Sequence, residues 1–487
     1  MPSKSPLPAE TSTRTQSLGI WDTACLLIGI VVGTGIFKAP PLVFGNVPNV
    51  QTGLLVWSGG ALLALCGALC YCELATTYPQ FGAEYIYLSR AYGRRLGFLF
   101  AWMQLCVILT GNIGIMVFVF ADYAATLSPA LESFKAAIAS TGLIALTLVH
   151  LCGIQIGKTL QNVLSLGKIA ALLTILVIGV LASSPAAVPD VIDPGSSSNI
   201  GLALVFVLYA YGGWNDVAQV TPEVQNFQRN MPRALIMGLS LIALLYLGLN
   251  FAFYNVLGFD GLRQSQAPAT EVVSLIVGRQ ASAMMSLIVM CSALGAVHGM
   301  LFASPRLLAA IGQDFRLFAR WNQWSKNRVP TSAILTVMTI TLVLVLAVGT
   351  AAGRHWTTTM TTAIGLPRPD WQKYDGGFGT LVAATAPIFW FFFALSGLAV
   401  IVLRATDPQT PRPFRIPVYP LPPIVFCCSA VFMFWKSFEY AGELTLLSLP
   451  VAVIGIVLSF TKKNDNLESG TNLSSKHSAP SKSPGAE

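Results

Sequence analysis

Two short segments combine glycine with polar residues inside long apolar stretches. The first reads GIVVGTGIF and contains Gly33, Thr34 and Gly35, and the second reads YAYGGWN and contains Gly212 and Gly213. Clustered glycines favour a break in a helix, which leaves backbone N–H and C=O groups without helical partners. Free N–H groups at a helix start attract an anion, and free carbonyls at a helix end attract a cation. The two segments therefore favour a ligand with one charge of each sign, such as an α-amino acid.

The two breaks offer groups of opposite polarity to such a ligand. A half-helix beginning near Thr34 would direct its free N–H groups and the Thr34 hydroxyl at a carboxylate. Carbonyls left over around Val31 and near Tyr209 would accept hydrogen bonds from an ammonium. Glycines that only pack against neighbouring helices are the competing interpretation for either segment alone. The two segments together favour a binding site, because transporters bind substrate where helices are interrupted at corresponding positions in the two halves of the chain.

The second segment also bears on the side chain of the ligand. Gly212 would leave room for that side chain, and its pocket would be shaped by Tyr209, Tyr211, Trp214 or Asn215. No acidic residue lies in the core of either segment, although Asp216 is close. A cationic amino acid or a polyamine would be expected to need such an acid, so the sequence favours a neutral amino acid.

Two ionisable residues lie within apolar stretches. Lys168 is flanked by LSLG and IAALL. We expect it to have a function, because a charged side chain at membrane depth costs free energy. Its competing interpretation is snorkelling to the nearer surface, since it lies a few residues from the start of its stretch. Glu73, in the string CELATTYPQ, is expected to pair with an interior or cytoplasmic base rather than to touch the ligand.

The composition of the whole chain indicates that these apolar stretches lie in a membrane and not in water. Of 487 residues, 54% are hydrophobic and 10% are charged, against about 25% charged in soluble domains, and the mean hydropathy is +0.66. We expect an all-α integral membrane protein with about twelve transmembrane helices, since one span takes about 20 apolar residues. Disordered and collagen-like chains are excluded, and the net charge of +8 is too scattered for a nucleic-acid partner. The twelve stretches are 19–44, 53–78, 96–121, 137–156, 163–182, 200–220, 235–258, 281–311, 332–350, 381–403, 418–438 and 446–461.

The distribution of Lys and Arg predicts the orientation of these spans. An even number of spans places both termini on the same side of the membrane. The segments outside the stretches carry 19 Lys and Arg on that side and 6 on the other side. The positive-inside rule then places both termini in the cytoplasm of a multi-pass plasma (inner) membrane protein, surrounded by membrane lipid. Residues 1–18 are expected to be a cytoplasmic tail without a cleavable signal, 19–461 the transporter domain, and 462–487 a disordered cytoplasmic tail.

No pattern of catalytic or metal-binding residues emerges from the sequence. The nine cysteines lie in or beside apolar stretches, and the four histidines have no metal-ligand spacing. We therefore expect no enzyme activity, no metal and no cofactor. An amino acid sensor that binds without transport is an alternative, although the short tails leave no room for a signalling module.

Six strings along the chain carry a family resemblance. They are GIVVGTGIF, CELATTYPQFGAEYIYLSRAYG, LQNVLSLGKIAALL, YAYGGWN followed by TPEVQNFQRNMPRALIMG, SALGAVHGM, and LRATDPQTPRPFRIPVYPLPPI. Together the strings resemble the amino acid–polyamine–organocation (APC) superfamily, and among its branches the L-type amino acid transporters. The resemblance implies a LeuT-like fold with broken helices 1 and 6 and amino acid transport by alternating access. It also implies a five-plus-five inverted repeat, here about 19–182 and 200–403, followed by spans 11 and 12 at about 418–461.

The resemblance also assigns residues to the substrate site. The positions that match the lining of the family's site are Val31, Gly33, Thr34, Gly35, Tyr209, Gly212 and Asn215. Tyr209 stands where family members place an aromatic residue that closes over the substrate. Lys168 resembles a fixed substitute for the sodium ion that bridges the first broken helix in coupled relatives, which implies sodium-independent transport. A proton- or sodium-coupled symporter is the alternative.

The chain departs from the family's pattern in three places. The acidic pair usual after span 6 is here Pro222 and Glu223, and a usual proline is Phe227, so this end of span 6 is expected to be shaped differently. Residues 351–378 form an insertion on the outer side. Residues 122–136 lack the cysteine with which animal members tether a glycoprotein, so no disulfide-linked accessory subunit is expected.

Overall fold

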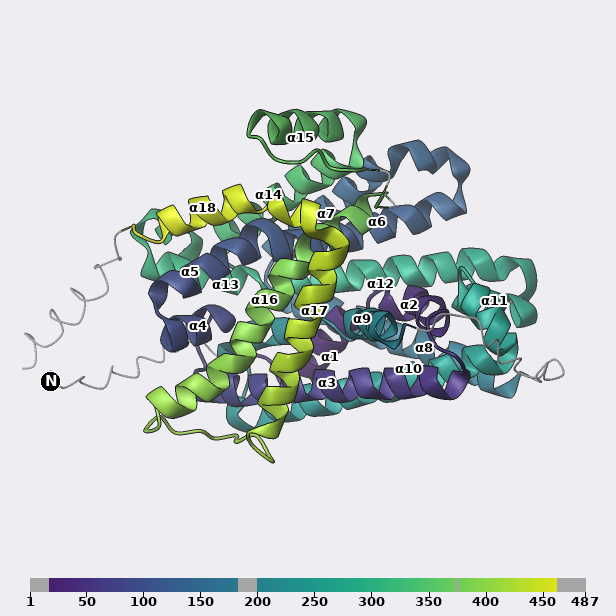
Figure 1. The fold of residues 1–487 in the computed structure, drawn as a ribbon, viewed down its shortest axis with the longest axis horizontal. Helices are drawn as coiled ribbons and strands as arrows, with labels where there is room; N and C mark the ends of the chain where they lie inside the picture. The colour runs from purple at the N-terminus through teal and green to yellow at the C-terminus, as the bar shows by residue number, and fades with distance from the viewer. Residues whose placement is uncertain (1–16, 183–198, 372, 375, 462–487) are drawn as a thin grey trace, which may run out of the picture.

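The computed structural model describes residues 17–182, 199–371, 373–374 and 376–461 as helices joined by short connections (Figure 1). Within these ranges β-type pairing is limited to one bridge between Leu18 and Val224, so the predicted all-α class is confirmed. The predicted tail 462–487 and all but the last two residues of the predicted tail 1–18 lie outside the described residues.

The first five predicted spans are present, and the first of them is bent by 50° at its break. A short helix outside the long apolar spans, α4 (Glu84–Tyr92), joins the second span to the third. The spans are α1 (Ile20–Val31) with α2 (Gly35–Phe44), α3 (Val50–Thr77), α5 (Arg94–Met103) with the π-helix η1 (Gln104–Ile108) and α6 (Leu109–Leu127), η2 (Pro129–Phe134) with α7 (Lys135–Leu151), and α8 (Ile154–Leu181).

The second half repeats the pattern of a broken span followed by long helices. Its spans are α9 (Ile200–Ala210) with the 3₁₀ helix η3 (Trp214–Glu223), α10 (Phe227–Gln264), α12 (Ala281–Ala303) with α13 (Pro305–Asp314), α14 (Thr331–Gly349), α16 (Gly376–Thr406) and α17 (Leu421–Leu446). Four short connecting helices lie among them: α11 (Pro268–Val277), η4 (Gly278–Gln280), η5 (Arg316–Asn322) and α15 (Ala351–Ala363), which lies in the insertion predicted at 351–378. The repeat boundaries at 19–182 and 200–403 stay a prediction.

The last predicted span is shorter than expected. The described residues contain ten long apolar helices, or eleven spans with the bent first pair, whereas the sequence predicts twelve. The twelfth stretch, 446–461, folds as α18 (Leu449–Leu458), whose ten residues rise about 15 Å. The hydrocarbon core of a bilayer is about 30 Å thick, so this helix alone is too short to cross it. Turns at both ends shorten α18: Leu446 belongs to α17, residues 447–448 form a turn before Pro450, and the helix ends at Leu458, before the end of the apolar stretch.

Two groups of helices face each other across the broken spans (Figure 1). In one group α10 packs against α1, α2 and α3, and α9 packs against α2 and α3. In the other group α6 packs against α7, α12 and α14. α1 of the first group packs against α12 of the second group, and α8 packs against α12 as well. The first break, at the end of α1, therefore lies between the two groups.

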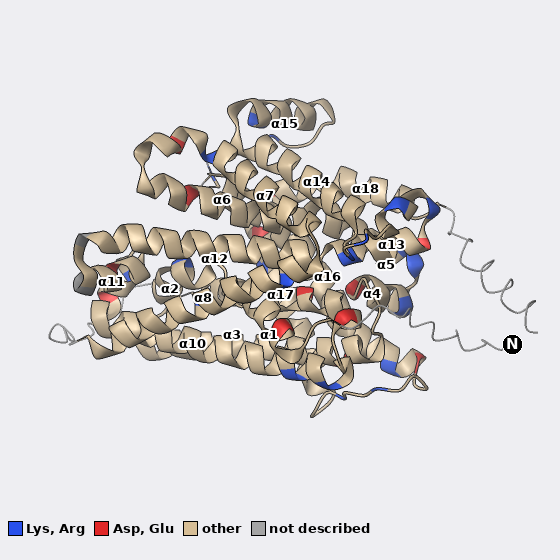
Figure 2. Cartoon of the chain, turned by 180° about the vertical axis from the view of Figure 1, so that it is seen from behind, with Lys and Arg blue, Asp and Glu red and all other residues tan. Residues whose placement is uncertain are grey.

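The outer faces of the bundle are apolar, and charge gathers toward one end. Side chains such as Leu55 and Leu62 on α3 are 70% and 61% exposed, as expected for helices that face lipid. In Figure 2 the long helices are almost uncoloured, and Lys and Arg cluster around α4, α5 and α13. We call this end, at which α1 begins, the α1 end.

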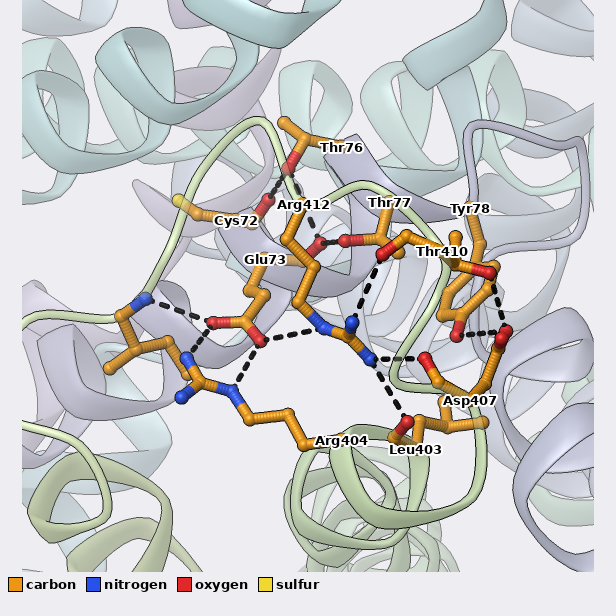
Figure 3. Close-up of polar contacts among 11 residues, drawn as sticks. Cys72, Glu73, Thr76, Thr77, Tyr78, Leu403, Arg404, Asp407, Thr410 and Arg412 are labelled. Carbon is orange, nitrogen blue, oxygen red and sulfur yellow. Dashed lines mark hydrogen bonds and ion pairs between the residues drawn. The ribbon is translucent and has the colours of Figure 1, made fainter.

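At the α1 end a buried carboxylate fastens α3 to the connection between α16 and α17 (Figure 3). Glu73, whose side chain is 3% exposed, accepts hydrogen bonds from Arg404 Nε at 2.7 Å and from the backbone N–H of Ile416 at 2.9 Å. Arg412 Nε lies 3.5 Å from the same carboxylate. This contact confirms the expectation that Glu73 pairs with a base.

We expect Glu73→Ala to lower the free energy of unfolding by about 2–3 kcal/mol, because two guanidinium groups lose their carboxylate and the more exposed of them, that of Arg404, is 22% exposed. The measurement is thermal unfolding of the detergent-purified protein, followed by tryptophan fluorescence. Glu132→Ala is the matched control, since Glu132 pairs with Lys135 but its side chain is 64% exposed. Equal melting temperatures for the two variants would contradict this role of Glu73.

Candidate substrate site

The first break leaves one helix end and one helix start facing each other. α1 ends at Val31, and α2 begins at Gly35 without a side-chain cap, so the first N–H groups of α2 are open toward the break. The backbone N–H of Gly33 turns back and donates to the carbonyl of Val31 at 2.8 Å. A Cβ on Gly35 would lie 2.8 Å from Cα of Ala210, so glycine here lets the two broken spans touch.

The second break is a turn that only glycine adopts without strain. α9 ends at Ala210, and Gly213 has a φ of +100°, in the left-handed region. The N–H of Gly212 donates to the carbonyl of Tyr209 at 3.1 Å, and the chain then continues as the 3₁₀ helix η3. The sequence therefore predicted both the position and the cause of this break.

The two breaks border one cavity of about 120 Å³. All seven predicted site residues line it: Val31, Gly33, Thr34, Gly35, Tyr209, Gly212 and Asn215. The broken spans also contribute Ile30, Leu208, Ala210, Gly213 and Asp216. The rest of the wall comes from η1, α6, α12 and α16, with Gln104, Asn112, Ile115, Met116, Ala296, Met300, Val382, Thr385, Ala386, Phe389 and Trp390. The free N–H groups of α2 and the last carbonyls of α9 thus border the same space, which is the arrangement that a carboxylate and an ammonium on one carbon require.

Lys168 lies behind the first break and points into the protein. Its side chain on α8 is buried, and its Nζ donates to the carbonyls of Gly29 and Val32, at 2.7 Å each. Both carbonyls belong to the end of α1, where no helical N–H is available to them. The ammonium therefore compensates backbone groups at membrane depth and does not extend to a surface.

Two further side chains hold the same break and were not predicted. Ser292 on α12 donates from Oγ to the carbonyls of Val32 at 3.0 Å and Gly33 at 3.1 Å. The hydroxyl of Tyr246 on α10 donates to the carbonyl of Val31 at 3.4 Å. Ser292 lies in the string SALGAVHGM, but nothing in a lone serine shows which backbone it meets.

The structure corrects two details of the predicted pocket. Tyr211 and Trp214 pack against other rings, Trp57 at 5.8 Å and Tyr71 at 5.1 Å between centroids, and they are absent from the cavity wall within the described chain. Asp216, which the sequence left beside the site, does line the cavity.

A polar residue from the third span also reaches the cavity. Gln104 opens the π-helix η1, and the hydroxyl of Thr110 donates to the carbonyl of Leu105 across this widened turn at 2.9 Å. Single π-turns inside α-helices are frequent at functional sites because they turn a side chain out of the regular register. A polar residue in an apolar stretch was the available signal for Gln104.

The fold and this cavity define a class of protein: a multi-pass membrane transporter with a cavity at the breaks of two interrupted helices. The sequence profile described as amino acid permease matches residues 18–459, nearly the whole described chain. The chain belongs to this amino acid permease family, and it is a transporter of amino acids.

The names of similar proteins also state amino acid transport. The b(0,+)-type amino acid transporter 1 of Mus musculus is 26% identical over 431 residues, which cover 86% of this chain and 82% of the relative. The Homo sapiens protein of that name is 27% identical over 436 residues, 87% and 83% of the two chains. Large neutral amino acids transporter small subunit 2 of Rattus norvegicus is 28% identical over 483 residues, 95% and 85% of the two chains.

We expect Gly212→Trp to abolish transport, because an indole at this position would fill the cavity. Uptake of labelled amino acid into liposomes that contain the purified variant measures the effect. Gly59→Trp is the matched control, since a side chain added at Gly59 on α3 meets open space. Equal uptake by Gly212→Trp and the wild type would contradict the assignment of this cavity.

We expect Lys168→Ala to reduce transport about tenfold or more, because leaving buried carbonyls without a donor costs about 1–3 kcal/mol. Lys436→Ala on the exposed face of α17 serves as the control and should transport normally. Snorkelling predicts a near-neutral substitution at position 168, so full activity of Lys168→Ala would remove this residue from the mechanism.

Proposed function

We propose that this permease carries neutral L-amino acids across the plasma membrane by alternating access, without sodium and without chemical change of the substrate. The cavity between two helix breaks carries the proposal. It offers backbone N–H groups to a carboxylate and backbone carbonyls to an ammonium, and both sets are shared by every α-amino acid. The rest of the wall then selects among side chains.

The wall of the facing helices supports a neutral substrate. Its largest members are apolar, among them Ile115, Met116, Phe389 and Trp390, and its polar members Asn112 and Thr385 are uncharged. A cationic or anionic side chain would lose its hydration there without an ion pair from these helices. Asp216 lies on the opposite wall, and its carboxylate accepts a hydrogen bond from Asn215 at 3.2 Å.

The contacts of Lys168 support transport without sodium. A cation bound at the end of α1 would need the carbonyls of Gly29 and Val32, and the lysine ammonium already holds both. Two positive charges at one pair of carbonyls repel each other strongly in a medium of low dielectric constant. A sodium ion is therefore not expected at this position.

The positive-inside rule supports an orientation with both termini in the cytoplasm. Arg90, Arg94 and Arg95 lie at the α1 end, as do the arginines of η5 and of the connection after α16. The α1 end would then face the cytoplasm, and the insertion that contains α15 would face outward. The end of the described chain returns to the α1 end as well, because the Arg95 guanidinium lies 4.3 Å from the ring centroid of Phe460, which follows α18.

A disulfide-linked accessory subunit is not part of the proposal. The relative named large neutral amino acids transporter small subunit 2 is by its name one component of a larger assembly. In this chain the connection between α6 and α7, residues 128–134, has no cysteine to form such a link. Migration of the membrane-extracted protein on a non-reducing gel at the position of the single chain would support this.

We expect purified protein in liposomes loaded with unlabelled leucine to accumulate labelled leucine, phenylalanine and glutamine, and to exclude lysine and glutamate. Replacement of sodium by choline at constant ionic strength should leave uptake unchanged. A steep sodium dependence would favour a sodium-coupled symporter. Binding of leucine without any flux would favour a sensor, and efficient lysine uptake would contradict the neutral specificity.

A further inference from the structure

Two carboxylates lie buried beside the substrate cavity without a basic partner. Glu84 on α4 is 2% exposed and Asp216 on η3 is 7% exposed. The same amide nitrogen, Nδ2 of Asn215, donates to Glu84 at 3.1 Å and to Asp216 at 3.2 Å. Gln219 donates to the second oxygen of Glu84 at 2.8 Å. Among the described residues no Lys, Arg or His forms an ion pair with either acid, so only hydrogen-bond donors and no full positive charge compensate them.

The backbone around Glu84 is shaped to hold it there. α4 begins at Glu84 itself, directly after Gly82 and Ala83, whose φ angles are +99° and +34°. A positive φ is strained for alanine and persists only where the surroundings enforce it. The turn directs a charged residue into the protein at a helix start, where an ordinary surface helix would leave it in solvent.

A second, much smaller cavity lies against Glu84. Its volume is about 10 Å³, and Gln104 and Asn215 line both this space and the substrate cavity. Tyr71 and Ser396 also border it with buried hydroxyls, and the Tyr71 hydroxyl lies close enough to Ser396 and to Glu84 to form hydrogen bonds with them. A space of about 10–15 Å³ with several polar neighbours holds one water molecule. The polar groups around this space therefore suit one water molecule between Glu84 and the substrate cavity.

Two desolvated carboxylates that share one hydrogen-bond donor cannot both be ionised cheaply, because like charges repel strongly away from water. One proton on the pair removes this repulsion. A substrate amine is less suited to neutralise Glu84, because the space beside this carboxylate admits a water molecule and not a side chain. Of the two acids only Asp216 lines the substrate cavity, so a proton can enter there, and water in the small cavity beside Asn215 and Gln104 can carry a proton to Glu84.

We propose that Glu84 and Asp216 form a proton-binding site that takes up one proton for each amino acid carried inward. The proton comes from the outer solution and is released on the inner side with the substrate, so no other reactant is needed. The inference rests on the proposed function, because it assigns a coupling ion to the same transport cycle.

The groups around the pair are consistent with this assignment. α3 contributes the Tyr71 hydroxyl and α4 the Tyr87 hydroxyl, while η1 and α16 contribute the uncharged Gln104 and Ser396. The basic residues nearby are engaged elsewhere: Arg306 with Glu223 at the end of η3, and Arg94 of α5 with the carbonyl of Asp314. Burial raises the pKa of Glu84, which lies on α4 outside the long apolar spans, to about 7.

The test is uptake of labelled leucine by protein in liposomes of fixed internal pH. An acidic outer solution should accelerate uptake, a protonophore should remove the acceleration, and a pH dye inside the vesicles should record proton entry when leucine is added. With a pKa raised to about 7, the protonated fraction falls about tenfold between pH 6 and pH 8, and initial uptake should fall with it. Glu84→Gln and Asp216→Asn should lose the acceleration by the gradient, since neither amide titrates.

Glu439→Gln, whose side chain on α17 is 61% exposed, is the matched control and should keep the gradient response. Wild-type counterflow that ignores the pH gradient, with no proton entry recorded by the dye, would overturn the proton site even if the variants failed to fold. Retention of the gradient response by Glu84→Gln would overturn it as well. Absence of counterflow for every amino acid would instead overturn the proposed function.

Discussion

The structure depends on how backbone groups are satisfied where the first helix stops within the membrane. Carbonyls without helical partners are costly in an apolar medium, and Gly29, Val31 and Val32 all present such groups. Lys168, Ser292 and Tyr246 satisfy them from three different helices. The break can therefore persist without a bound ion, and the N–H groups on its other side stay available to a substrate. Helices α8, α10 and α12 are positioned by the same contacts, so the break organises its neighbours.

Charge in the interior is distributed unevenly around the cavity. On one side the ammonium of Lys168 is held by carbonyl dipoles, and on the other side the acids Glu84 and Asp216 are held by the amides of Asn215 and Gln219. Neither group meets an opposite full charge among the described residues, in contrast to the fully paired Glu73 and Arg306 at the α1 end. Interior charges that only dipoles compensate respond to protons and ligands, whereas paired charges hold helices together.

Both the substrate cavity and the small cavity lie between the two helix groups. Asn215 and Gln104 border both spaces, one from a broken span and one from a π-turn in the facing group. Movement of one group against the other would change the two spaces together. In the proposed proton site this geometry would link occupation by an amino acid to the protonation of Glu84 without direct contact between them.

The sequence by itself determined the membrane class, the boundaries of most spans and the place of the two breaks, because hydropathy and glycine placement are local properties of the chain. The seven predicted wall residues came from the family resemblance of the motifs around these breaks. The sequence predicted too long a last span, since turns take both ends of the twelfth apolar stretch. It could not show that Ser292 and Tyr246 reach the first break, that Tyr211 and Trp214 turn away, or that Glu84 meets Asn215 across 131 positions. Those contacts join helices distant in sequence, so the packing of the two helix groups decided them.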